Sequence, residues 1–142
     1  MSVSLSPDGR WLAYRSNEAG RDEIYVQPYP DGGAKVQVST ESGFQPVWAR
    51  DGGTLYFRSA SELMSARVIP GPRIAFEPPR ALFQDRFERP QGGAHTTYDV
   101  FPDGSFLFLE LATPADTSSA NRSVVATFHW LENLDLSARP AP

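Results

Sequence analysis

Residues 6–16 read Ser-Pro-Asp-Gly-Arg-Trp-Leu-Ala-Tyr-Arg-Ser, a turn sequence followed at once by an apolar run. The same arrangement recurs at residues 49–59, which read Ala-Arg-Asp-Gly-Gly-Thr-Leu-Tyr-Phe-Arg-Ser, and at residues 101–110, which read Phe-Pro-Asp-Gly-Ser-Phe-Leu-Phe-Leu-Glu. Asp8 and Asp51 are 43 residues apart, and Asp51 and Asp103 are 52 residues apart. A period of roughly 40–50 residues indicates a repeated supersecondary unit of about four strands.

Each copy contains the residues that a tight β-hairpin needs. Pro presets φ, Asp bonds to nearby backbone and Gly accepts positive φ, so we expect a type I turn with a bulge. Arg50 replaces Pro in the second copy, which leaves that turn less preorganised. The apolar runs after the turns do not alternate, which predicts strands buried on both faces. Sheets packed between two neighbours provide that environment, so the sequence predicts an all-β propeller of four-stranded antiparallel blades.

The whole chain, residues 1–142, is predicted to be one partial propeller domain of about three blades. Their approximate bounds are 1–42, 43–85 and 86–134, followed by a frayed tail at 135–142. Residues 129–134 are expected to make one or two turns of helix. The expected strands are Ser2–Leu5, Trp11–Ser16, Glu23–Tyr29 and Lys35–Ser39, then Gln45–Ala49, Thr54–Ser59, Leu63–Val68 and Arg80–Phe83, and finally Thr97–Phe101, Phe106–Leu111 and Ser123–Phe128. The expected core residues are Trp11, Tyr14, Leu55, Phe57, Phe106 and Phe108.

Composition narrows the class of protein. Thirteen Pro and eleven Gly in 142 residues punctuate many short strands, and a formal charge of −4 argues against binding to nucleic acid or an anionic membrane surface. The absence of cysteine excludes disulfides, thiol catalysis and cysteine-based zinc sites. No apolar run reaches the roughly 18–20 residues that span a bilayer, and the N-terminus lacks the features of a signal peptide. The compartment stays open.

Four segments carry a resemblance to a known family. Residues 6–14, 24–30, 45–52 and 124–134 resemble TolB-type β-propeller repeats, which are WD-like repeats with a Ser-Pro-Asp-Gly turn. More narrowly, they are similar to the C-terminal propeller of bacterial receptor-like serine/threonine kinases. Members of this propeller family are often periplasmic or extracytoplasmic. The resemblance implies a fold but no single activity, because such blades also occur in binding proteins, peptidase accessory domains, lyases and sensors.

Three blades are half of a six-bladed ring, so an apolar sheet face is expected to lie open at each end. Two explanations stay open at this point. A second copy related by a two-fold axis along the channel would close the ring as a homodimer. Alternatively, the chain is part of a longer propeller that supplies the missing blades.

Motifs for chemistry are scarce. His95 precedes a predicted inner strand, where it is positioned to act as an acid, base or ligand at the channel mouth, but the only other histidine is His129 and no metal-ligand spacing exists. The turn aspartates Asp8, Asp51 and Asp103 occupy one position of each repeat, which favours a structural role. No Gly-x-Ser-x-Gly elbow is present. The sequence therefore predicts no catalytic residue, no metal site and no cofactor.

Two classes of function remain. The first is a non-catalytic module that binds a protein or a small molecule on the loops at the channel mouth. These loops are 17–23, 40–45, 60–62, 87–96 and 112–122, all expected on the face opposite the Asp-Gly turns. The second is a hydrolase or lyase, which needs a histidine, an arginine and a carboxylate converging at that mouth. The candidate binding residues are Arg21, Asp22, Glu23, Phe44, Gln45, Arg89 and His95.

Overall fold

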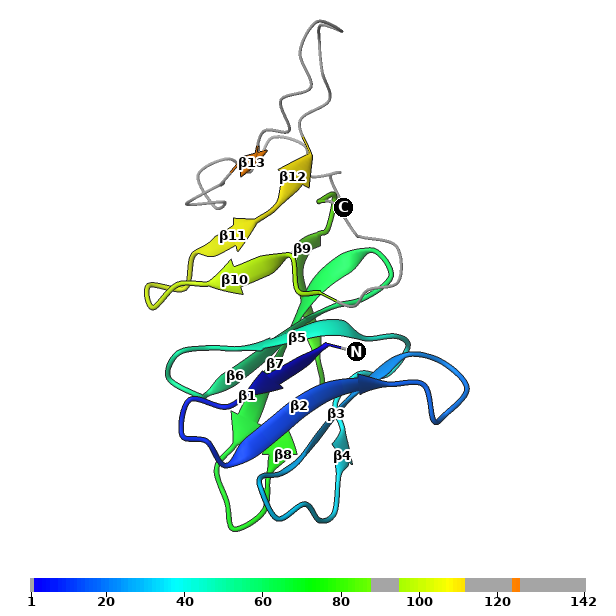
Figure 1. The fold of residues 1–142 in the computed structure, drawn as a ribbon, viewed down its shortest axis with the longest axis vertical. Coiled ribbons are helices and arrows are strands. Elements are labelled where there is room, and N and C mark those ends of the chain that lie inside the picture. The colour runs from blue at the N-terminus through cyan, green and yellow to red at the C-terminus, as the bar shows by residue number, and fades with distance from the viewer. Residues whose placement is uncertain (1, 88–94, 112–123, 126–142) are drawn as a thin grey trace, which may run out of the picture.

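The computed structural model describes residues 2–87, 95–111 and 124–125. These residues form antiparallel sheets joined by turns and loops, and they contain no helix (Figure 1). The expected all-β class is therefore confirmed for the described residues. The predicted helical turn at 129–134 and the tail at 135–142 lie outside the described residues.

The first sheet holds four strands in the order in which they occur along the chain. They are β1 (Val3–Leu5), β2 (Trp11–Ser16), β3 (Glu23–Pro28) and β4 (Val36–Gln37). Each strand is antiparallel to the next, and the register pairs Leu5 with Leu12 and Tyr14 with Tyr25. Four strands within residues 1–42 are what the repeat predicts.

The second sheet holds five strands. They are β5 (Phe44–Trp48), β6 (Thr54–Arg58), β7 (Glu62–Ile69), β8 (Ala75–Phe76) and β9 (Arg80–Gln84). The long strand β7 pairs with β6 along one edge, and its other edge is shared by β8 and β9. The sequence predicts one outer strand here, and the structure divides that role between two short ones, with the Pro78–Pro79 pair between them. Proline cannot donate a ladder hydrogen bond, which explains the interruption.

Two shorter pairings follow. Strands β10 (Tyr98–Val100) and β11 (Phe106–Phe108) form an antiparallel hairpin that we call the third sheet. Strand β12 (Glu110–Leu111) pairs with β13 (Val124–Val125). The single strand predicted at 106–111 is thus interrupted at Leu109, and β13 falls inside the strand predicted at 123–128, whose last three residues lie outside the described residues.

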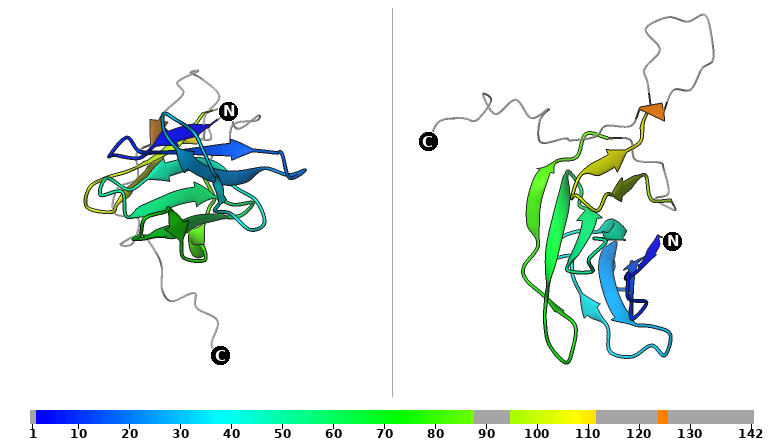
Figure 2. Two further views of the ribbon diagram at one scale, coloured as in Figure 1. Left: turned by 90° about the horizontal axis from the view of Figure 1, so that it is seen from below. Right: turned by 90° about the vertical axis from the view of Figure 1, so that its left-hand side faces the viewer.

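The sheets stack face to face, with the second sheet between the other two (Figure 1). Seen from below in Figure 2, the blue strands of the first sheet lie over the teal and green strands of the second. One apolar cluster fills the space between the first and second sheets, and another fills the space between the second sheet and β10–β11. The first cluster contains Ala13, Ile24, Val26, Val38, Trp48, Leu55, Phe57, Ala66 and Ile74, and the second contains Leu63, Tyr98, Val100, Phe106 and Phe108.

The three Asp-Gly turns have the predicted geometry. Gly9, Gly52 and Gly104 have φ values of 72°, 72° and 84°, which L-residues with a Cβ rarely adopt. In each turn the Asp side chain accepts a backbone N–H from two residues further on, for example Ser105 N to Asp103 Oδ1 at 2.9 Å. The structural role predicted for these aspartates is therefore confirmed.

The core prediction needs one correction. Leu55, Phe57, Phe106 and Phe108 are buried, but Trp11 and Tyr14 are only half-buried. Strand β2 has one face in the first cluster, through Ala13, while Tyr14 points to the opposite face of the first sheet, on which no described sheet packs. The expectation that β2 is buried on both faces is therefore wrong for the described residues.

Candidate functional site

The predicted loop residues around Glu23 form a local structural cluster. The Glu23 side chain is fully buried, and its carboxylate accepts hydrogen bonds from Arg21 Nε and Ser39 Oγ. Arg21 also donates to the Thr40 carbonyl at 2.8 Å, so it joins two neighbouring loops. This leaves the exposed Arg21 as the part of the cluster that a partner can reach.

Asp22 and Phe44 meet through a residue that the sequence does not single out. Arg15 is on β2. Its Nε lies 3.5 Å from Asp22 Oδ1, and its guanidinium carbon lies 5.9 Å from the centre of the Phe44 ring. Gly43 N donates to the Asp22 carbonyl at 2.9 Å, so the loops 17–23 and 40–45 are neighbours. Asp22 and Arg15 line a shallow cavity of about 340 Å³.

Gln45 belongs to a buried polar cluster centred on Arg58. The Arg58 guanidinium donates to both carboxylate oxygens of Asp85, to Thr97 Oγ1 at 2.7 Å, to Gln45 Oε1 at 3.3 Å and to the Phe87 carbonyl at 3.0 Å. The side chains of Arg58 and Asp85 are 1% and 0% exposed. Because the charges are paired and shielded from water, this cluster is an internal link between the second and third sheets rather than a ligand site.

The backbone at Gln45 is adapted to this link. Gln45 has a φ of 50°, and a β-bulge lies between Phe44 and Val47. The Gln45 backbone carbonyl accepts a hydrogen bond from the Tyr98 hydroxyl at 2.8 Å, and the Gln45 side-chain Nε2 donates to the His95 carbonyl at 2.7 Å. Burial raises the pKa of Tyr98 well above its usual value, so its hydroxyl keeps the proton that it donates.

The structure brings some of the seven predicted residues together but gives them separate roles. Gln45 and His95 are adjacent, while Arg21 and Glu23 form a different group. His95 is exposed, and the contact to Gln45 is made by its carbonyl oxygen rather than by its imidazole. Arg89 lies outside the described residues. The Arg58–Asp85 pair was not predicted, although the sequence carries two signals for it. Arg58 comes directly after the apolar residues of β6 and Asp85 directly after β9, and a charged residue at the end of a buried strand is expected to be paired.

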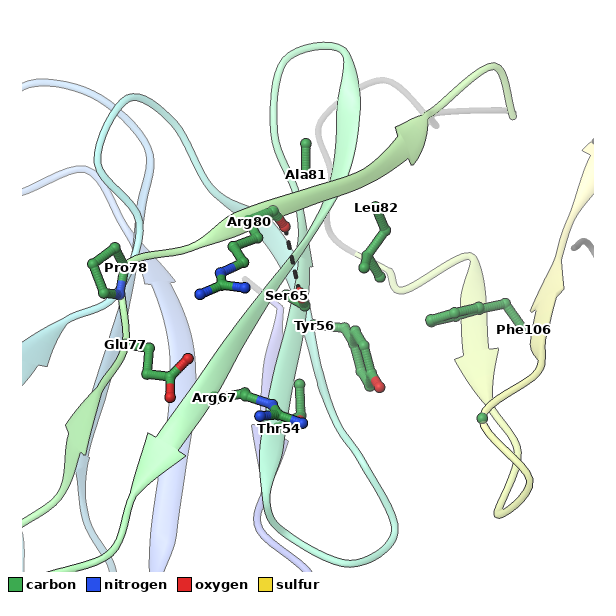
Figure 3. A pocket seen from close by; sticks show the side chains of 11 residues that line it. Thr54, Tyr56, Ser65, Arg67, Glu77, Pro78, Arg80, Ala81, Leu82 and Phe106 are labelled. Atoms are coloured by element: carbon green, nitrogen blue, oxygen red, sulfur yellow. Dashed lines mark hydrogen bonds between the residues drawn. The ribbon is translucent and has the colours of Figure 1, made fainter. Parts of the chain in front are cut away.

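A larger feature lies on the second sheet, beyond the area covered by β10–β11. It is a groove of about 680 Å³ lined by Thr54, Tyr56, Ser65, Arg67, Glu77, Pro78, Arg80, Ala81, Leu82, Gly104 and Phe106. Figure 3 shows that Arg67, Arg80 and Glu77 lie at one end and that Tyr56, Leu82 and Phe106 lie at the other. The Tyr56 and Phe106 rings meet edge to face, with centres 5.1 Å apart. These residues could not be identified from the sequence, because they are far apart along the chain and belong to no motif.

The outer face of the first sheet is the other open surface. Paired residues in an antiparallel ladder share a face, so Val3, Leu5, Leu12 and Tyr14 lie on the side opposite Ala13. Val3 and Leu5 are 51% and 47% exposed. At the other end of the stack, Leu107 is half-buried and Leu109 is 41% exposed. Apolar side chains are thus open at both ends of the stacked sheets.

The described residues contain no group of three or more histidine, aspartate or glutamate side chains arranged to hold a metal ion. Nor does any helix in the described ranges have the length and apolar character needed to cross a membrane. No protein-family model matches this chain, and a search of the curated proteins finds no relative.

Proposed function

We propose that this chain is a non-catalytic binding and assembly module of the TolB-like β-propeller type. In this proposal the three stacked sheets are three blades, and two chains close a six-bladed ring. The observation that supports it is the stacking itself: the second sheet has an apolar cluster on each of its two faces, whereas the outer face of the first sheet exposes Val3 and Leu5. A sheet face of this kind is stabilised when another sheet covers it.

The occupant of the open face is a second copy of the chain. A two-fold axis along the ring would place the outer face of the first sheet against the outer face of the third sheet of the partner, at two equivalent contacts. Leu5 is exposed on the outer face of the first sheet, and Leu109, which follows β11 directly, is 41% exposed. Apolar surfaces gain roughly 25 cal/mol per Å² when they are removed from water, and this gain depends little on salt.

The loops at one end of the ring would then form the surface that binds a protein or a small molecule. Of the predicted loop residues, Glu23 and Gln45 are committed to buried contacts, so binding would use the exposed Arg21 and His95 and the partly exposed Asp22 and Phe44. Rigid sheets that position variable loops are a common basis for recognition. No observation on the described residues favours the hydrolase or lyase alternative.

Cross-linking tests the head-to-tail geometry directly, because the chain has no cysteine of its own. A Leu5→Cys chain and a Leu109→Cys chain, mixed and treated with a short bismaleimide, should give a covalent heterodimer. The matched control pairs Leu109→Cys with Ile69→Cys, since Ile69 is 45% exposed on β7, away from both end faces. Equal yields from the two mixtures, or a product formed only between two Leu5→Cys chains, would contradict the proposed ring.

A further inference from the structure

The groove on the second sheet carries positive charge that the described residues leave unpaired. Arg67 on β7 and Arg80 on β9 are exposed, and neither makes an ion pair with a carboxylate among the described residues. Glu77 is the acidic residue that lines the same groove. Among the described residues that line the groove, two side chains are positive and one is negative, in a chain whose formal charge is −4.

The other end of the groove is apolar and aromatic. The Tyr56 and Phe106 rings form one wall, and Leu82 lies beside them (Figure 3). Partial burial raises the pKa of Tyr56, and the nearby Asp51 adds to this effect while Arg67 opposes it. The Tyr56 hydroxyl is therefore protonated at neutral pH, where it serves as a hydrogen-bond donor. Thr54 and Ser65 add two further hydroxyls to the lining.

We propose that this groove binds a small organic anion, with its carboxylate groups at Arg67 and Arg80 and a flat apolar body against Tyr56 and Phe106. A guanidinium presents a planar set of donors that matches the two oxygens of a carboxylate. A volume of about 680 Å³ falls within the range of about 300–1,000 Å³ found for small-molecule sites. None of the residues that line the groove belongs to the predicted binding loops, and Val3, Leu5 and Leu109 are not among them.

The test uses isophthalate, an aromatic ring with two carboxylates, and compares it with isophthalamide, its neutral analogue of similar shape. The full chain, labelled with ¹⁵N, is titrated with each compound and followed by NMR. We expect isophthalate to shift the amide signals of Thr54, Ser65 and Gly104 saturably. Isophthalamide should bind at least about tenfold more weakly, because it cannot form charge-assisted hydrogen bonds.

Substitutions separate a specific site from general charge attraction. Arg67→Gln and Arg80→Gln should each weaken isophthalate binding by about three- to tenfold, as expected for exposed ion pairs of modest strength. The matched control is Arg73→Gln, which removes an exposed arginine that does not line the groove. Its affinity should equal that of the unmodified chain. Circular dichroism checks that every variant keeps the fold.

Three results would overturn the proposal. The first is the absence of saturable shifts in the unmodified chain, and the second is equal binding of isophthalamide, which would leave the arginines without a role. The third is an equal loss of affinity in Arg73→Gln, which would indicate general attraction of anions.

Discussion

Replacing Arg58 with Leu tests the buried link between the second and third sheets. The substitution removes the partner of the Asp85 carboxylate, which is 0% exposed and retains a hydrogen bond from Phe87 N at 3.3 Å. It also removes a donor to Thr97, to Gln45 and to the Phe87 carbonyl. Breaking a buried ion pair by removing one partner costs about 3–5 kcal/mol, because the remaining charge is left in the interior.

This loss is large compared with the total stability of a small domain, which is about 5–15 kcal/mol. The melting temperature should therefore fall by roughly 10–20 °C. Urea unfolding followed by tryptophan fluorescence measures the free energy of unfolding. The double variant Arg58→Leu/Asp85→Leu removes both charges, so it should be more stable than the sum of the two single substitutions predicts, by about 2 kcal/mol.

The control is an ion pair at the surface. Arg50 Nη2 and Asp99 Oδ2 lie 3.9 Å apart, and the two side chains are 65% and 60% exposed. Arg50→Leu should therefore cost less than about 1 kcal/mol. If Arg58→Leu changed stability as little as Arg50→Leu does, or if the two substitutions at Arg58 and Asp85 were simply additive, the buried pair would not link the sheets as described.

Three further predictions follow from the core and the turns. Phe106→Ala should cost about 3–5 kcal/mol in urea unfolding, because Phe106 is buried in the second apolar cluster, and a neutral result would remove β11 from the interior. Gly9→Ala should cost about 1 kcal/mol, because φ is 72° although no atom within 4 Å obstructs a Cβ; an unchanged stability would argue against this turn geometry. Two hydrogen bonds lower the pKa of Asp8: the one from the Ser6 hydroxyl has the larger effect, and the one from the Arg10 amide has the smaller. Ser6→Ala should therefore raise the pKa of Asp8 in an NMR titration. The stabilisation from Asp8 is present above the pKa of an unfolded aspartate and is lost as pH falls through the lower folded pKa, so Ser6→Ala should destabilise the chain more at pH 7 than at pH 2; a difference independent of pH would contradict this assignment.

The local hairpins could be predicted from sequence because their information is local. Pro, Asp and Gly at fixed positions determine each turn, and strand β2 begins and ends at the predicted residues, Trp11 and Ser16. Burial was harder to predict, because it depends on which sheet packs on which face. Tyr14 and Phe57 occupy similar apolar runs, but Phe57 lies between two sheets and Tyr14 lies on the open face.

The candidate sites could be predicted only in part. Loop connectivity predicts only that these loops share one face, and the structure places Gln45 next to His95 and Asp22 next to Gly43. Loop connectivity does not indicate whether a side chain is exposed to a partner or bonded inside the protein. The Gln45 side chain is bonded inside, because it accepts hydrogen bonds from Arg58 and Thr97. The groove was missed because Arg67, Arg80 and Phe106 are brought together by the pairing of β7 with β9 and the stacking of β11, contacts that a local pattern does not specify.

The central claim, that two chains complete one ring through their open sheet faces, is tested most directly by sedimentation equilibrium at micromolar concentration. The predicted mass is twice the 15.7 kDa of one chain, and it should stay the same between low and high salt because the contact is apolar. A stable monomer at this concentration would contradict the claim and would instead favour the chain being one part of a longer propeller.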